Sequence, residues 1–114
     1  MGDSAVLDIN RVADFGAASD FEKKHTPFVT LEPMGNKVRI SVEVGHEVPH
    51  PNGTDHYITS IEVYTGPVPL ARFYFTPVTA YPVVSVVAAL PAGTVITAVG
   101  HCNLHGFWSY EQTV

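Results

Sequence analysis

Cysteine is nearly absent from this chain of 114 residues, which contains a single one, at position 102. One cysteine cannot close a disulfide within the chain. A domain of this length buries roughly two-thirds of its unfolded surface, which is enough to fold without such a cross-link. The first residues also lack the basic start and long apolar run of a secretory signal. We therefore expect a single core in a reducing, cytoplasmic environment.

Long hydrophobic runs and an excess of positive charge are missing as well. No stretch approaches the ~18 consecutive apolar residues of a membrane-spanning helix. Six lysines and arginines are outnumbered by eleven aspartates and glutamates, which gives a formal net charge of −5. Phosphate binding requires many basic side chains, so this balance argues against a nucleic-acid partner. We expect neither a nucleic acid nor a membrane as a partner.

The few basic residues are unevenly distributed, because four of the six lie between Lys23 and Arg39. Positive charge gathered on one part of an acidic protein could guide a small anion to that place. A run of charges is equally typical of a solvated surface. The cluster alone therefore leaves both interpretations open.

Alternating apolar and polar residues predict several β-strands. From Lys37 to Val44, valine or isoleucine occupies every second position, which is the pattern of a strand buried on one face. Four more runs rich in β-branched and aromatic residues are predicted strands, at 57–64, 70–75, 83–89 and 94–99. Prolines and glycines fall between these runs and indicate turns.

Short strands separated by turns, with no helix long enough to connect parallel strands, are typical of two packed antiparallel sheets. We predict an all-β fold, an immunoglobulin-like antiparallel β-sandwich of about seven strands. Residues 1–20 show no clean hydrophobic period, so they are expected to form an irregular N-terminal arm. Residues 21–114 are expected to form one metal-binding sandwich domain.

Five side chains that bind metals well are gathered in three short segments. Cys102 and His105 are three residues apart, and His50 and His56 flank a Pro-Asn-Gly turn. His25 precedes a Thr-Pro pair. The predicted strands leave all five at strand ends or in loops, where β scaffolds usually present their sites. A lone histidine or buried cysteine is more often structural, and it is the grouping that indicates a metal centre.

The number and kind of these ligands narrow the choice of metal. Structural zinc closes with four ligands, whereas iron with five or six positions could use all five and keep one position open. Blue-copper proteins also place histidines and a cysteine on a β-sandwich, but they usually add an axial methionine, and only Met1 and Met34 are available. A cupredoxin-like electron carrier is the main alternative, followed by a zinc-stabilised interaction domain. His46 and His101 are interpreted as non-ligands.

Three segments together resemble the superoxide reductases of the one-iron neelaredoxin type, within the desulfoferrodoxin iron-binding family: residues 24–27 (Lys-His-Thr-Pro), 45–58 and 102–108. The resemblance implies an immunoglobulin-like sandwich that carries one mononuclear non-haem iron, cycling between Fe2+ and Fe3+. It also implies the ligands, which are four equatorial imidazoles and one axial thiolate: His25, His50, His56, His105 and Cys102.

The activity implied by this resemblance is the reduction of superoxide to hydrogen peroxide without release of oxygen. An external electron donor such as rubredoxin would then reduce the iron again. Lys24 corresponds to the lysine that attracts superoxide in similar proteins and helps to deliver a proton. Similar proteins are often homotetramers, which implies a homo-oligomer with a role in electron transport and in detoxification under oxidative stress.

One position departs from the family pattern. The family commonly has a glutamate two residues before the first histidine ligand, where its carboxylate occupies the sixth iron position in the oxidised enzyme. Lys23 stands at that position here, and Glu22 lies one residue earlier. Either a shifted loop brings Glu22 to the iron, or the position is left to water or hydroxide.

The turn that follows Cys102 is expected to moderate electron donation by its sulfur. The backbone amides of Leu104 and His105 would donate hydrogen bonds to the sulfur from this turn. A structure in which neither amide contacts the sulfur would contradict this expectation.

Overall fold

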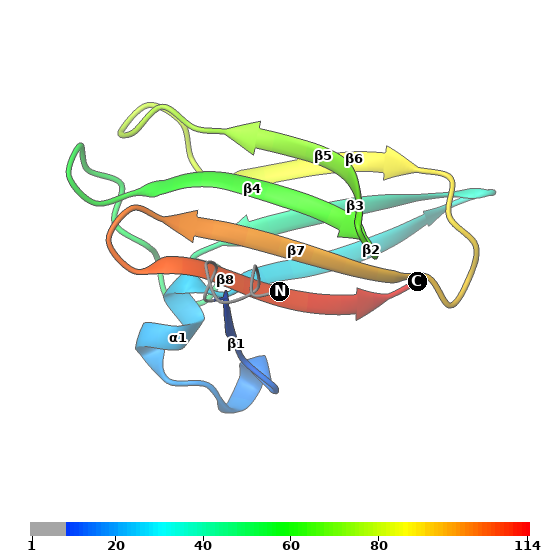
Figure 1. Cartoon of the computed structure of the whole chain (residues 1–114), viewed down its shortest axis with the longest axis horizontal. Coiled ribbons are helices and arrows are strands. Elements are labelled where there is room, and N and C mark those ends of the chain that lie inside the picture. Colours follow the sequence, from blue (N-terminus) through cyan, green and yellow to red (C-terminus); the bar gives the residue numbers. More distant parts are fainter. Residues whose placement is uncertain (1–8) are drawn as a thin grey trace, which may run out of the picture.

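The computed structural model describes residues 9–114, in which two β-sheets pack face to face (Figure 1). The strands are β1 (Ile9–Arg11), β2 (Pro27–Met34), β3 (Lys37–Val44), β4 (Ile58–Thr65), β5 (Val68–Tyr74), β6 (Val83–Ala88), β7 (Val95–Cys102) and β8 (Gly106–Thr113). One sheet has the strand order β1-β8-β7-β4-β5 and the other the order β2-β3-β6. A 3₁₀ turn (η2, Phe15–Ala17) and one short helix (α1, Asp20–His25) precede β2.

The predicted β-sandwich is confirmed, with differences in detail. The structure has eight strands in its described part, and β1 pairs with β8 in parallel rather than antiparallel register. The segment predicted as an irregular arm contains β1 and η2 within residues 9–20, while its residues 1–8 lie outside the described part. The domain boundary at residue 21 stays a prediction.

The core lies between the two sheets and is built mainly by β3, β4 and β7. Alternate residues of these strands point inward, as the period of a half-buried strand requires. Ile40, Ile61 and Ile96, one from each strand, are fully buried. Antiparallel pairing of β4 with β7 sets Ile61 opposite Gly100. The register shifts between Ile58 and Ser60, and beyond this irregularity Ile58 pairs with Cys102, the last residue of β7.

Helix α1 is short because its start and end are both set by local chemistry. The hydroxyl of Ser19 accepts a hydrogen bond from the Glu22 amide at 3.1 Å, and the Glu22 carboxylate accepts one from the Ser19 amide at 2.9 Å. This capping box begins the helix. Thr26 precedes Pro27, and a residue before proline disfavours helical backbone. The helix therefore ends at His25, and no helix in residues 9–114 has the length and apolar character to cross a membrane.

One end of the sandwich collects the segments that hold the predicted ligands (Figure 1). The loop from residue 45 to residue 57, the β7–β8 turn and helix α1 meet there. The β2–β3 turn lies at the opposite end. Three segments far apart in the sequence are thus brought together by the pairing of β2, β3, β4, β7 and β8.

We expect Ile61→Ala to lower the free energy of unfolding of the metal-free protein by about 3 kcal/mol, because it removes buried methyl groups and leaves a cavity. Urea unfolding followed by circular dichroism measures the change. The control is Val87→Ala on the edge strand β6, where the side chain is 40 % exposed, with an expected loss of less than about 1 kcal/mol. Equal losses in the two variants would contradict the assignment of the core.

Candidate metal centre

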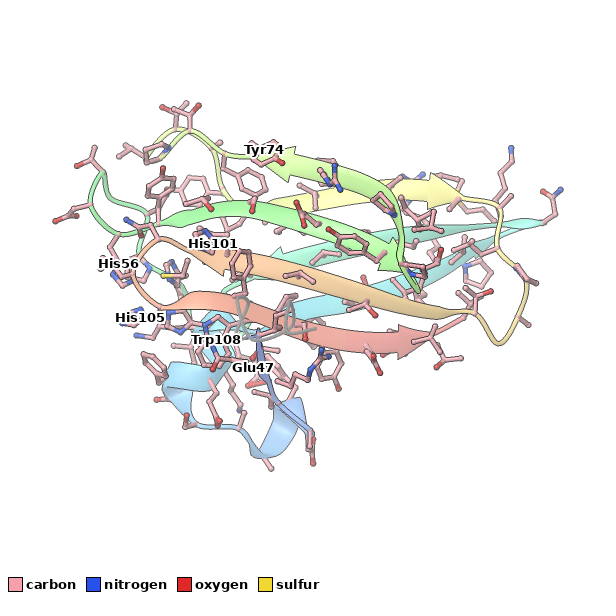
Figure 2. The ribbon with its side chains drawn as sticks, viewed as in Figure 1. Glu47, His56, Tyr74, His101, His105 and Trp108 are labelled. Atoms are coloured by element: carbon pink, nitrogen blue, oxygen red, sulfur yellow. The ribbon has the colours of Figure 1, made fainter. Side chains whose placement is uncertain are left out.

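Four of the five predicted ligands form one cluster at the end of the sandwich. One nitrogen or sulfur atom from each of His25, His56, Cys102 and His105 lies within 4.8 Å of the others. Figure 2 shows His56 and His105 at this end, next to the β7–β8 turn. Bonds to zinc, for example, are about 2.0 to 2.3 Å long, which puts opposite donors roughly 4 to 4.6 Å apart. The spacing of the four donor atoms therefore fits a single metal ion.

The fifth predicted ligand, His50, lies beside this cluster. Its ring centroid is 4.9 Å from that of His25 and 4.8 Å from that of His56, both in edge-to-face contact. Nε2 of His50 and Nε2 of His56 are buried and have no hydrogen-bond partner. A buried polar atom without a partner costs about 1 to 3 kcal/mol. A metal ion bound between these two atoms and the three other donors would give both atoms a partner.

Backbone carbonyls determine which nitrogen is free in two of the imidazoles. Nδ1 of His50 lies 2.7 Å from the carbonyl oxygen of Pro51, and Nδ1 of His25 lies 2.7 Å from that of Phe21. A carbonyl only accepts, so each Nδ1 carries the hydrogen and the neutral ring presents an unprotonated Nε2. This is the usual way in which a second contact orients a metal-binding histidine.

His105 presents the other ring nitrogen. Its Nδ1 lies 3.2 Å from Nε2 of His25 and 3.7 Å from the sulfur of Cys102. Its backbone carbonyl accepts a hydrogen bond of 3.1 Å from the indole of Trp108. His105 and Cys102 are three residues apart, and the tight turn between β7 and β8 turns both side chains toward the same point.

The imidazoles of His25 and His50 are held in their neutral form. The pKa of His50 is lowered to about 4, mainly by burial and to a smaller extent by the nearby His25, His56 and Lys24, while the hydrogen bond to Pro51 opposes this shift. Burial also lowers the pKa of His25, with smaller contributions in the same direction from neighbouring charges. Only neutral imidazole binds a metal, so the site is ready to accept one near neutral pH.

Two aromatic side chains enclose the cluster. The Trp108 ring stacks on His25 with centroids 5.0 Å apart, and the Phe21 ring contacts His25 at 4.6 Å and His105 at 5.1 Å. Neither residue was predicted to belong to the site. The i, i+4 spacing of Phe21 and His25 was a usable signal, because such residues face the same side of a helix. Phe21 and Trp108 thus pack against the rings of His25 and His105 on one side of the cluster.

Two expectations about these residues are corrected by the structure. His25 is the last residue of helix α1 rather than a strand-end or loop residue, whereas Cys102 lies at a strand end as expected, although β7 extends beyond the predicted strand 94–99. No hydrogen bond joins the Cys102 sulfur to the amides of Leu104 or His105, all of which belong to the described part; its polar contact is the His105 imidazole. Helix capping and the long β4–β7 ladder extend both elements further than sequence periodicity indicated.

The two histidines interpreted as non-ligands have other partners. The His46 ring stacks on Phe28 with centroids 3.7 Å apart, and its Nδ1 lies 2.8 Å from the Glu43 carboxylate. His101 lies 2.6 Å from the hydroxyl of Thr59. Neither belongs to the cluster of donor atoms.

The charged residues before His25 are directed to different places. The Glu22 carboxylate is engaged in the capping box, and the Lys23 ammonium lies 3.0 Å from the Glu47 carboxylate. Lys23 also lies 5.8 Å from the centre of the Phe15 ring. Lys24 is close enough to His25 and His50 for its charge to lower the pKa of both.

A β-sandwich that gathers imidazole donors and one thiolate at its end is typical of a metalloprotein. The family model described as desulfoferrodoxin matches residues 17–111. The superoxide reductase of Pyrococcus furiosus is 32% identical in an alignment 110 residues long, which covers 81% of this chain and 89% of that protein. The chain belongs to the desulfoferrodoxin family.

Solved structures agree with this assignment. The superoxide reductase from Nanoarchaeum equitans superimposes with a TM-score of 0.78 at 26% identity. The superposition covers 94% of this chain and 100% of the Nanoarchaeum chain. The neelaredoxin from Ignicoccus hospitalis gives a TM-score of 0.76 at 28% identity, over 93% of each chain. These findings confirm the predicted resemblance, the iron cofactor and the superoxide reductase activity, and they do not favour the cupredoxin-like alternative.

We expect Gly45→Ala to weaken iron binding at least tenfold. Gly45 has φ +93°, and a Cβ atom there would lie 2.7 Å from the backbone nitrogen of His50, so the loop that carries His50 would have to move. The control is Gly93→Ala, which has φ +91° but open space around the added Cβ. Competition with a chelator measures both affinities. Equal iron affinity in the two variants would show that the position of His50 is unimportant for binding.

Proposed function

We propose that His25, His50, His56, His105 and Cys102 together hold the iron at which this protein reduces superoxide to hydrogen peroxide without releasing oxygen. The observation that carries the proposal is the pair of buried, unpartnered Nε2 atoms of His50 and His56 beside the other three donors. When bound there, iron supplies the single electron by changing between Fe2+ and Fe3+. The balanced reaction takes up one electron and two protons for each superoxide ion.

Lys24 is proposed to attract superoxide and to hold a proton near it. The ammonium group adds positive charge beside the imidazoles in a protein whose formal net charge is −5. Lys24 forms no ion pair with residues 9–114, whereas Lys23 is paired with Glu47. A local positive field raises the rate at which a small anion reaches the site. Lys24 is therefore the free cation of this segment, and Lys23 is not a second one.

Cys102 is proposed to act as the anionic donor of the site. The residue is fully buried at the end of β7, so the sulfur is shielded from other thiols and from water. A thiolate binds metals where a thiol does not. Its donation increases the electron density at the metal, which is the property that axial thiolates provide in haem proteins.

The proposal includes an external one-electron donor, such as rubredoxin, in the cytoplasm. The exposed His105 ring and the Phe21 side chain, which is 46 % exposed, support entry of electrons at this end of the molecule. The homotetramer implied by the family resemblance is also proposed. Support for association comes from the edge strand β6, where Val83 is 61 % exposed and Val87 is 40 % exposed.

The direct test is metal analysis together with an optical spectrum of the purified protein before and after superoxide is added to its reduced form. We expect one iron per chain and a visible thiolate-to-iron band that develops as superoxide oxidises the iron. In Cys102→Ser that band should be absent even when iron is bound. Zinc or copper in the protein, with no response to superoxide after iron reconstitution, would overturn the proposal.

We expect Lys24→Ala to slow the second-order reaction with superoxide about tenfold at low salt and to flatten its dependence on ionic strength, because electrostatic attraction is screened by salt. Pulse radiolysis over a range of salt concentrations measures the rate. Lys37→Ala, which removes a lysine at the opposite end of the sandwich, serves as the matched control with the same change in net charge. Identical salt dependence in the two variants would exclude a steering role for Lys24.

A further inference from the structure

The turn between His50 and His56 is fastened to a distant loop by one side chain. The amide of Asn52 forms three hydrogen bonds with residues 78 and 80, in the segment between β5 and β6. Its Oδ1 accepts from the Val78 amide at 3.0 Å, and its Nδ2 donates to the carbonyl oxygens of Val78 at 3.3 Å and Ala80 at 3.2 Å. The backbone N–H and C=O of Val78 are thus both bound by the same side chain.

Val78 itself has an unusual backbone. Its φ is +71°, and it is the one non-glycine residue within the described part of the chain with a positive φ. A β-branched residue rarely adopts this conformation, and such outliers persist only where surrounding interactions impose them. The Val78 side chain is 54 % exposed, so burial does not compensate the strain. Two local backbone hydrogen bonds span Val78, from the Thr79 amide to the Pro77 carbonyl at 2.8 Å and from the Ala80 amide to the Thr76 carbonyl at 3.0 Å. The bonds to Asn52 are the ones that tie this strained turn to the ligand-bearing loop.

The other side of the turn is fixed to the segment that carries Cys102. Two backbone hydrogen bonds between Gly53 and His56, of 3.0 and 3.2 Å, close the turn. The Asn103 side chain accepts from the Tyr57 amide at 3.0 Å and donates to the Asp55 carbonyl at 3.0 Å. The turn with its two histidines is therefore held between two asparagine side chains.

The turn needs such anchors because residues 45–57 contain no regular strand or helix apart from the isolated Gly53–His56 bridge. Helix or sheet hydrogen bonds position two of the other donors, since His25 ends α1 and Cys102 ends β7. The indole of Trp108 binds the carbonyl of His105 in the short turn between β7 and β8. The two histidines of the loop are also the two whose Nε2 atoms lack partners. Their direction has to be imposed by contacts of the loop with its neighbours.

We propose that Asn52 is a positioning residue for the iron centre: it anchors the His50–His56 turn on the strained Val78 loop and so directs both Nε2 atoms toward the metal. The proposal rests on the proposed ligand set. Residues that orient metal ligands without touching the metal typically alter affinity 10- to 100-fold when they are removed. The side chain of Asn52 acts on the histidines through the backbone of the turn and makes no contact with the iron.

The test compares Asn52→Ala with the unaltered protein. We expect iron affinity to fall about tenfold or more, and the thiolate-to-iron band and the ferric electron paramagnetic resonance signal to shift. In the iron-free protein, the amides of Gly53, His56 and Val78 should exchange with solvent at least tenfold faster. The control is Asn36→Ala in the β2–β3 turn, which removes the same side chain at the opposite end and should change none of these.

Two further variants test the anchor in other ways. Asn52→Asp keeps the acceptor for the Val78 amide but loses both donated hydrogen bonds. We therefore expect a smaller loss of iron affinity and a smaller rise in amide exchange than in Asn52→Ala. This variant replaces Asn52→Ala in the test if Asn52→Ala does not fold. Val78→Gly relieves the backbone strain and keeps all three hydrogen bonds, so it should retain the normal spectra and affinity. Native spectra, affinity and exchange in both Asn52 variants would overturn the proposal.

The two proposals fail in distinguishable ways. The proposed ligand set would be overturned if the iron spectra of His50→Ala and His56→Ala were the same as those of the unaltered protein. That result would show that iron binds without these two histidines. The exchange rates of the iron-free protein report on the Asn52 anchor whatever the metal does. Normal exchange in Asn52→Ala, with the ligand set intact, would overturn the anchor alone.

Discussion

Imidazole nitrogens that are buried and left unpaired are the constraint on which the rest of this structure depends. Each costs about 1 to 3 kcal/mol in the metal-free protein, a large share of the stability of a small domain. A metal ion that binds only the folded chain recovers this cost, because a ligand that is selective for the native state stabilises that state. The metal centre and the fold are therefore coupled, and much of the molecule serves to keep the two Nε2 atoms of His50 and His56 in place.

The sandwich meets this constraint by bringing its two sheets close together beneath the site. Gly100 of β7 shows how close they come, since a Cβ atom there would lie 3.1 Å from the side chain of Val44 and 3.6 Å from that of Pro27. Val44 is the last residue of β3 and Pro27 the first of β2. The three strands therefore approach one another just where the chain leaves them for the ligand-bearing segments. A larger residue at position 100 would move the cluster apart at its base.

The sequence pattern predicted the five consecutive strands β3 to β7 and missed β1, β2 and β8. The strand predicted at 37–44 coincides with β3, because every second residue faces the core. β2 was missed because it contains Pro27 and Pro33, which usually argue against a strand. The two prolines are tolerated because β2 lies at an edge of its sheet, a position that depends on tertiary structure.

The candidate site could be predicted from ligand chemistry and from the family motif, but its supporting contacts could not. The five candidate donor residues were predicted from residue type and spacing, and the structure brings four of them into one cluster with His50 beside it. The choice of free nitrogen depends on carbonyl groups such as that of Pro51, and the anchor between Asn52 and Val78 joins residues 26 positions apart. No local pattern encodes such contacts, because they arise only when the loops meet in the folded protein.

The departure from the family pattern before His25 has a physical explanation in the geometry of one helical turn. Successive side chains of a helix point in directions about 100° apart, so neighbouring charged residues contact different partners. In α1, Glu22 closes the capping box, Lys23 pairs with Glu47 of the ligand-bearing loop, and Lys24 adds its charge beside the imidazoles. At the position where relatives commonly carry a carboxylate, this chain thus has a cation that ties α1 to the loop of His50. The helix that presents His25 is held to that loop by charge as well as by ring contacts, and Lys24 forms no ion pair within residues 9–114.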